Sequence, residues 1–280
     1  MSFAHRWQAL SAERSALCLG VAPSAKWLAL WKLADDQAGA RRYCDILLAA
    51  CAESVAAVKI QVPFFMRFGE PGVRLLRWFT DRAHDNGTLV LLDAKLCDAA
   101  DTMDAWAQFA LGPASVLGGD AVTAHCYMGF ESLDPLLLGA AATGTAVFVI
   151  VRTSNHAAEE VQRASAGGLT MAEFAAGKIT DWNSRHAAGQ PAGPAGAVVG
   201  ARDPESSALY RRLPRSLVEV PGLGRSDRSA VELLGAAAQL GWRALYTVTT
   251  GVLASGPDAG SLRSALSSWS LTIGQVPGDR

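Results

Sequence analysis

The sequence predicts an α/β protein, a single (β/α)8 TIM barrel that spans residues 1–280. Three observations support this fold. Eight short apolar runs are spread along the chain, and most are uninterrupted, as in parallel strands buried on both faces. Longer segments with helical spacing separate them. The length suits one barrel, which typically needs about 250 residues.

The predicted strands end in polar residues or glycine, at the positions where a barrel carries its chemistry. They are Ala16–Val21, Val55–Val62, Thr88–Lys95, Asp120–His125, Ala146–Asn155, Ala195–Ala201, Ser216–Gly224 and Ala244–Thr250. The side chains near these carboxyl ends are therefore the first candidates for a functional site.

Three intervening segments have clear helical spacing: Arg41–Ser54, Gly72–Gly87 and Ser229–Trp242. The second places its apolar residues on one face, and its final glycine can end the helix. Glycine, proline and alanine dominate Ala187–Gly196, which predicts a surface loop within the domain and not a domain boundary.

Composition excludes several classes of function. The formal net charge is -1, so no nucleic-acid partner is expected. Five dispersed cysteines without a CxxC pair favour a reducing cytoplasm over a disulfide framework.

The longest apolar run, Leu136–Val151, is too short and too interrupted for a membrane span. The N-terminus lacks the apolar core of a signal peptide. No motif predicts a metal or another cofactor.

A cluster of opposite charges follows the third apolar run. Asp93 and Lys95 are two residues apart, so their side chains point to the same side of a strand. Carboxylates keep a neighbouring lysine protonated, and a fixed ammonium can give its proton to a forming carbanion. Asp98 follows closely, and Lys59 lies in the second run. The alternative is a salt-bridge cluster that only closes the barrel end.

Around this cluster the chain resembles the orotidine 5′-phosphate decarboxylase family, in its longer bacterial branch. The similar segments extend almost from end to end of the chain. They are LCLGVAPS near Cys18, VAAVKIQVPFFMRFG at Val55–Gly69, LLDAKLCDAADT at Leu91–Thr102, DAVTAHCYMGFESLDPLL at Asp120–Leu137, VFVIVRTSN at Val147–Asn155, AVVGA at Ala197–Ala201 and VPGLG at Val220–Gly224.

The resemblance implies a cofactor-independent decarboxylase that works as a homodimer on a small carboxylated molecule. By this resemblance Lys95 protonates the C6 carbanion, and Asp93 lies beside the departing carboxylate. Lys59 bonds the ribose and orders the charges. Asp98 and Thr102 reach the site from the neighbouring subunit.

The chain departs from the family pattern around the ligand. The aspartate that holds the ribose at the end of the first strand is replaced by Ala22, and the serine that contacts the pyrimidine is replaced by His125. His125 either lines the pocket, where it can bond the base or act as an acid, or is a satisfied core histidine.

The phosphate loop departs further. The family reads P-G-x-G-x-Q-G-G, whereas this chain continues from Pro221 and Gly222 with Ser226 in place of the glutamine. Thr250 stands where the family has a phosphate-binding arginine. An arginine–phosphate contact contributes roughly 1.5–3 kcal/mol or more for each hydrogen bond, so its loss predicts a weak phosphate site.

These departures predict a decarboxylase whose substrate is pyrimidine-nucleoside-like, or a related carboxylated molecule, without the usual 5′-phosphate. Two alternatives stay open: an ordinary orotidine 5′-phosphate decarboxylase that makes UMP, and a catalytically silent binding relative. Arg152 and Arg225 either bind an anion from a new direction or are solvated loop arginines.

Overall fold

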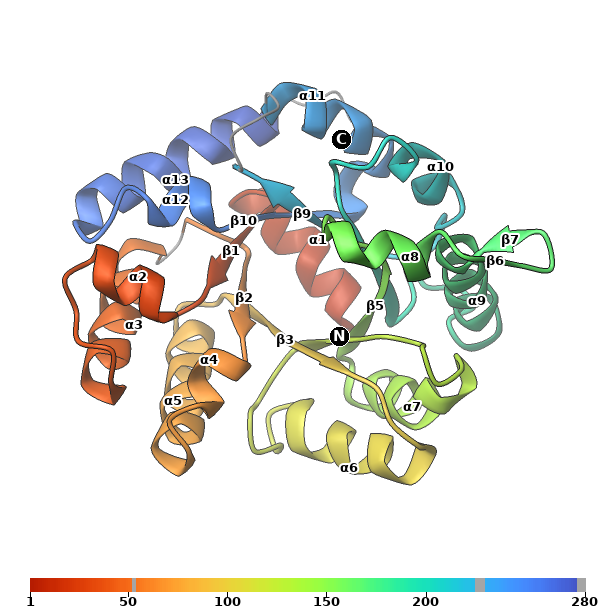
Figure 1. The fold of residues 1–280 in the computed structure, drawn as a ribbon, viewed down its shortest axis with the longest axis horizontal. Helices are drawn as coiled ribbons and strands as arrows, with labels where there is room; N and C mark the ends of the chain where they lie inside the picture. Colours follow the sequence, from red (N-terminus) through yellow and green to blue (C-terminus); the bar gives the residue numbers. More distant parts are fainter. Residues whose placement is uncertain (52–53, 225–229, 276–280) are drawn as a thin grey trace.

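Eight parallel strands close into a barrel in the order β1-β10-β9-β8-β5-β4-β3-β2, which confirms the predicted (β/α)8 fold (Figure 1). The structure is a computed structural model that describes residues 1–51, 54–224 and 230–275. The barrel strands are β1 (Leu17–Val21), β2 (Ala57–Gln61), β3 (Leu89–Leu96), β4 (Ala121–Ala124), β5 (Ala146–Arg152), β8 (Ala195–Val199), β9 (Val218–Leu223) and β10 (Ala244–Val248). Each overlaps one predicted run.

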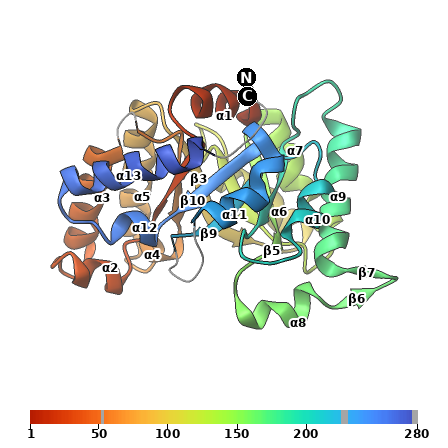
Figure 2. The same cartoon turned by 90° about the horizontal axis from the view of Figure 1, so that it is seen from above.

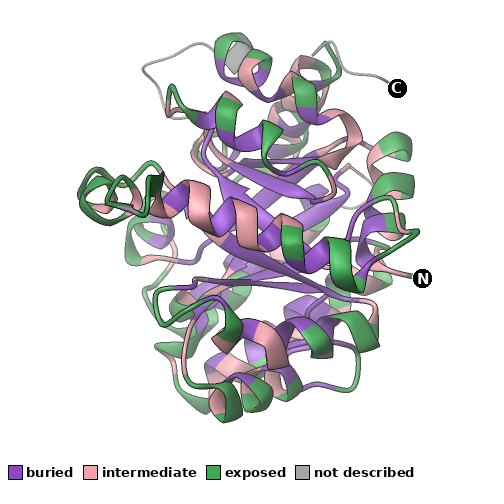
Figure 3. Ribbon diagram, turned by 90° about the vertical axis from the view of Figure 1, so that its right-hand side faces the viewer, coloured by how far each residue is buried: buried purple, intermediate pink, exposed green. Residues whose placement is uncertain are grey.

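Helices surround the barrel, and most of them bury one face against it (Figure 3). They are α1 (Phe3–Glu13), α2 (Ala25–Leu30), α3 (Gln37–Cys51), α4 (Pro63–Met66), α5 (Glu70–Asp85), α6 (Ala100–Ala110), α7 (Asp134–Thr143), α8 (Glu159–Gln162), α9 (Met171–His186), α10 (Ser206–Arg211), α11 (Ala230–Ala237), α12 (Thr250–Leu253) and α13 (Ala259–Gly274). Short 3-10 turns are η1 (Glu131–Leu133), η2 (His156–Ala158) and η3 (Ala238–Arg243).

Two of the three predicted helices are present as α3 and α5, and the third is shorter than predicted. The segment expected to be helical to Trp242 ends its α-helix at Ala237 and continues as η3. Gly241 has a φ of 54° there, which breaks the helical path. Ser229, at the other end of that prediction, lies outside the described residues.

The run Leu136–Val151 forms most of α7, a turn and most of β5. Gly144 ends α7 with a φ of 70°, in the left-handed region that glycine adopts without strain. Within the described residues, no helix combines the length and the apolar character needed to cross a membrane.

The two ends of the barrel differ. α1 covers the end at which the strands begin, while α8 and the small hairpin of β6 (Ser165–Ala166) and β7 (Leu169–Thr170) project at the other end (Figure 2). Phe3 of α1 packs edge-on against Phe148 of β5, with ring centroids 5.8 Å apart. Trp7 donates its indole N–H to the carbonyl of Trp242 at 2.9 Å. The closed end leaves the carboxyl ends of the strands as the place for a ligand.

Candidate active site

Charged side chains point into the barrel interior, nearer the carboxyl ends of the strands than the apolar residues that fill it. Along a strand, every second residue faces the same side, so a charged residue two positions beyond an inward apolar residue also faces inward. Three strands follow this pattern, with the pairs Ala57 and Lys59, Leu91 and Asp93, and Leu217 and Glu219.

Asp93 is the centre of the charge cluster and is only 2% exposed. Its Oδ1 accepts from Lys95 Nζ at 2.5 Å and from the Thr123 hydroxyl at 2.8 Å. Its Oδ2 lies 3.3 Å from Lys59 Nζ and accepts from the Gln61 side chain at 2.5 Å. Both carboxylate oxygens are thus held by fixed donors, which fixes the orientation of the group.

Lys95 is held in an uncommon backbone conformation. Its φ is 51°, in the left-handed region that costs a residue other than glycine on the order of 1 kcal/mol. Its backbone N–H donates to the Thr123 hydroxyl at 3.0 Å, and the register between β3 and β4 shifts here. The side chain is 49% exposed, so the ammonium is anchored on Asp93 yet reaches the cavity.

The cluster keeps its members charged. Burial by itself would raise the pKa of Asp93, but Lys59 and Lys95 outweigh it and lower the pKa below its ordinary value of 3.8. Burial would lower the pKa of Lys59, but the carboxylates of Glu219 and Asp93 outweigh it and raise the pKa. At neutral pH, the structure therefore holds ammonium groups beside a carboxylate.

Sequence reasoning missed Glu219. Its Oε2 accepts from Lys59 Nζ at 3.1 Å, and its side chain is fully buried. The signal was a lone carboxylate between two valines in the run Ser216–Gly224. A charge inside a barrel strand needs a partner across the interior, so the position of this carboxylate within the run predicts a buried ion pair.

Two cavities open at the carboxyl ends of the strands, on either side of the cluster. The first has a volume of about 350 Å³, and Lys59 and Gln61 line it together with residues from β1, β9 and the start of α12. Ala22, Pro221, Gly222 and Thr250 of the sequence analysis all lie in its wall.

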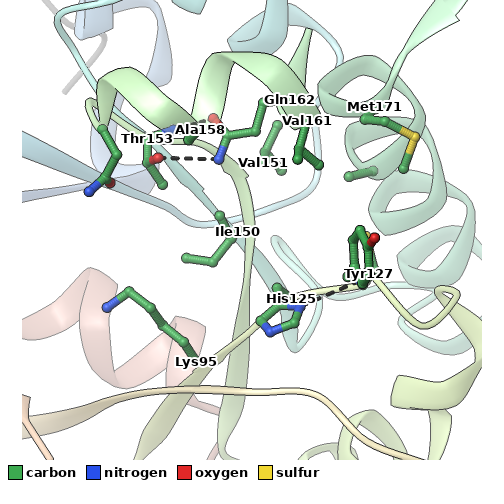
Figure 4. A pocket seen from close by; sticks show the side chains of 13 residues that line it. Lys95, His125, Tyr127, Ile150, Val151, Thr153, Ala158, Val161, Gln162 and Met171 are labelled. Carbon is green, nitrogen blue, oxygen red and sulfur yellow. Dashed lines mark hydrogen bonds between the residues drawn. The ribbon is translucent and has the colours of Figure 1, made fainter. Parts of the chain in front are cut away.

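The second cavity has a volume of about 430 Å³ and a mostly apolar wall. In Figure 4, Lys95 and His125 extend toward it from below, while Val161 and Gln162 of the β5–α9 connection lie above. Gln162 holds this connection in place, because its side-chain N–H donates to the Thr153 hydroxyl at 3.2 Å. Lys95 therefore faces a cavity whose wall is mostly apolar.

His125 lines the second cavity and is half-buried. Burial lowers its pKa below the ordinary value of 6.5, so the imidazole is mostly neutral at pH 7. One ring nitrogen faces the backbone N–H of Tyr127 at 3.5 Å. The other is available to a ligand, and its role toward a pyrimidine remains a prediction.

Neither expectation for Arg152 fits its position. The side chain is 1% exposed, so it is not a solvated loop arginine, and it lines neither cavity. Its guanidinium lies 3.4 Å from an Asp203 oxygen and 2.7 Å from a Glu205 oxygen. Two carboxylates already compensate its charge, so Arg152 is not placed to bind an anionic ligand. Ser226 and Arg225 lie outside the described residues.

Asp98 and Thr102 do not join the cluster within one chain. Asp98 Oδ1 accepts from the N–H of Ala99 at 2.8 Å, and Thr102 lies in the first turn of α6. In the described part of the chain, no ion pair joins Asp98 to Lys59 or Lys95. Among the same residues, no group of three or more His, Cys, Asp or Glu side chains could hold a metal ion.

Comparisons with known proteins agree on one family. Residues 17–262 match the family described as orotidine 5′-phosphate decarboxylase / HUMPS. The chain is 38% identical over 267 residues to an orotidine 5′-phosphate decarboxylase of Myxococcus xanthus, covering 94% of this chain and 92% of that one. It is 40% identical over 265 residues to one from Salinispora arenicola, covering 94% of each.

Solved structures agree as well. A crystal structure from Streptomyces avermitilis, provisionally assigned as an orotidine 5′-phosphate decarboxylase, superposes with a TM-score of 0.92 at 34% identity. The alignment covers 99% of this chain and 96% of that one. The orotidine 5′-phosphate decarboxylase of Leishmania donovani superposes with a TM-score of 0.80 at 30% identity and covers 99% of both chains.

The buried position of Asp93 predicts a pH-dependent loss of stability in Asp93→Asn. At pH 7 the unfolding free energy should fall by about 3 kcal/mol, because Lys59 and Lys95 lose their shared counter-charge. The folded-state pKa of Asp93 is lowered, so its contribution is full above about pH 4 and fades as pH falls through the lowered pKa.

Denaturant unfolding of wild type and Asp93→Asn between pH 3 and 8 measures this difference. Asp181→Asn, on the exposed face of α9, is the matched control and should change stability little at any pH. A difference that stays constant throughout the acid range would contradict the electrostatic explanation.

Proposed function

Because this chain belongs to the orotidine 5′-phosphate decarboxylase family, and is thus a carbon–carbon lyase, we propose that it converts orotidine 5′-phosphate to UMP and CO₂. One observation carries the proposal: the Asp93 carboxylate is fixed between the ammonium groups of Lys59 and Lys95. Lys59 lines the first cavity and Lys95 lines the second. The curated relatives that share 38% and 40% identity carry the name of this activity.

The expectation of a substrate without a 5′-phosphate is not supported. It rested on Ala22, Thr250 and the changed loop after β9, but similarity to the named phosphate-ester decarboxylases extends over nearly the whole chain. Of the two alternatives, the ordinary orotidine 5′-phosphate decarboxylase fits these comparisons better than a decarboxylase of an unphosphorylated substrate.

The geometry suggests how the residues act. The substrate carboxylate would lie close to Asp93, whose negative charge disfavours the bound ground state more than the departing neutral CO₂. When the bond from C6 to the carboxylate breaks, its electron pair stays on C6. Lys95 then gives a proton from Nζ to C6 and recovers one from solvent. Thr123 and Gln61 keep Asp93 in place during this exchange.

The first cavity offers a cation for the phosphate. Lys26, near the start of α2, lines this cavity together with Gly222 and Thr250. Its Nζ lies 5.5 Å from the ring centre of Trp27, and no ion pair of Lys26 is among those of the described residues. We assign Lys26 to the phosphate, in place of the arginine replaced by Thr250.

A homodimer completes the site in this proposal. Asp98 lies in the β3–α6 connection and Thr102 in the first turn of α6. Among the described residues, neither forms a hydrogen bond or ion pair with Lys59, Asp93 or Lys95 of its own chain. In a two-fold dimer, an isologous interface at this edge would let each chain supply both side chains to its partner.

Lys95→Ala tests the proposed chemistry. With orotidine 5′-phosphate as substrate, kcat should fall about 10²–10⁴-fold, the usual contribution of a positioned general acid. Absorbance and released CO₂ measure turnover. Lys178→Ala, on α9 and paired with Glu131, is the control and should keep wild-type kcat. Wild-type protein that fails to turn over this substrate, but decarboxylates unphosphorylated orotidine, would overturn the proposal.

Lys26→Ala tests the phosphate assignment. KM for orotidine 5′-phosphate should rise about 10-fold, because a charge-assisted hydrogen bond to a phosphate is worth about 1.5 kcal/mol or more. KM for orotidine, which lacks the phosphate, should not change. Equal effects on both substrates would contradict a contact between Lys26 and the phosphate.

Mixing two inactive variants tests the shared site. Lys95→Ala and Asp98→Asn each damage both sites of their own dimers, whereas a hybrid dimer has one site with Lys95 and Asp98 both intact. An equal mixture should recover about a quarter of wild-type activity after exchange, since half the dimers are hybrid and each has one good site. A mixture no more active than the separate variants would refute sharing.

A further inference from the structure

We propose that Glu219 is a positioning residue of this active site. It supplies from β9 a carboxylate in place of the aspartate that the family pattern has on β1, where this chain has Ala22. The expected effect of Glu219 on kcat rests on the proposed function. Its structural basis, the contact between Glu219 and Lys59, is independent of the substrate.

Lys59 lies between two carboxylates. Its Nζ is 3.1 Å from Glu219 Oε2 and 3.3 Å from Asp93 Oδ2. Asp93 in turn is 2.5 Å from Lys95 Nζ. Glu219, Lys59, Asp93 and Lys95 therefore form a line of alternating charges that crosses the barrel from β9 through β2 to β3.

Glu219 makes this line neutral. The four formal charges are −1, +1, −1 and +1, which sum to zero, and without Glu219 they would sum to +1 in a buried site. Without Glu219, Lys59 would have Asp93 as its one carboxylate partner and would compete with Lys95 for it. Because Glu219 shares the charge of Lys59, Asp93 can pair with Lys59 and Lys95 at the same time.

Glu219 acts through Lys59 and not on the substrate. Its side chain is 0% exposed, and it lines neither cavity. Among the described residues, no group donates to its Oε1, so Lys59 is the partner that compensates its charge. A group so placed can orient the lysine and set its charge, but it cannot contact a ligand.

Ala22 occupies the place from which β1 could reach the same lysine. Gly20 of β1 is in register with Lys59 of β2, and Ala22 is two residues further on the same side. Ala22 and Lys59 both line the first cavity. A carboxylate at Ala22 would touch Lys59 from the cavity, whereas Glu219 touches it from the interior. A carboxylate at Glu219 instead of at position 22 keeps the line of alternating charges and leaves the cavity wall without a carboxylate at that position.

Glu219→Gln tests the role, because it keeps the shape and removes the charge. With orotidine 5′-phosphate, kcat should fall at least 10-fold, while KM changes less than 3-fold. Glu13→Gln, on the exposed face of α1 at the opposite end of the barrel, is the matched control and should keep wild-type kcat. The double variant Ala22→Asp with Glu219→Gln should recover most of the lost kcat.

A second measurement does not depend on turnover. NMR of ¹³C-labelled lysine follows the ionisation of Lys59, assigned with Lys59→Arg. The titratable groups that face Lys59 are Glu219, Asp93 and Cys18, and burial raises the pKa of Cys18 to about 12, so this thiol stays neutral. Removing the charge of Glu219 should move the titration of Lys59 to lower pH. Burial lowers the pKa of Lys59, and only the carboxylate of Asp93 would then oppose this effect.

The outcomes separate the two proposals. A downward shift of the Lys59 titration in a protein that does not use orotidine 5′-phosphate would support the charge line and reject the proposed substrate. An unchanged titration in folded Glu219→Gln would overturn the inference. So would wild-type kcat in that variant, or a loss of kcat in the folded single variant that Ala22→Asp does not repair.

Discussion

The ion pairs of Asp93 are the constraint on which this active site depends. A carboxylate that is 2% exposed is stable as an anion only if cations and hydrogen-bond donors hold it. Lys59, Lys95, Thr123 and Gln61 do so from three strands. Those strands must therefore keep one register, and the closed barrel enforces it.

The same constraint separates the rigid part of the site from the adaptable part. The charged layer stands on strands whose lower residues fill the barrel interior, so its side chains have little freedom. The cavity walls come largely from strand ends and connections, where substitutions cost less. This explains how the chain keeps Lys59, Asp93 and Lys95 while Ala22 and Thr250 replace charged residues of the family pattern.

A second group of ion pairs serves the fold. Arg152 at the end of β5 and Arg163 beyond α8 share the carboxylates of Asp203 and Glu205. These contacts tie the connection above the second cavity to the loop after β8. An arginine at a strand end can therefore look like a ligand-binding residue in the sequence while its charge is used to hold two loops together.

The sequence by itself determined the barrel and most of its charged layer. Uninterrupted apolar runs indicated eight buried strands, and the spacing of Asp93 and Lys95 placed both on one side of a strand, because these patterns are local. Only the tertiary structure decided what meets across the interior. Closure brings Glu219 to Lys59 over a separation of 160 residues and turns Arg152 away from both cavities. Such pairings depend on the order and register of distant strands, which no local pattern encodes.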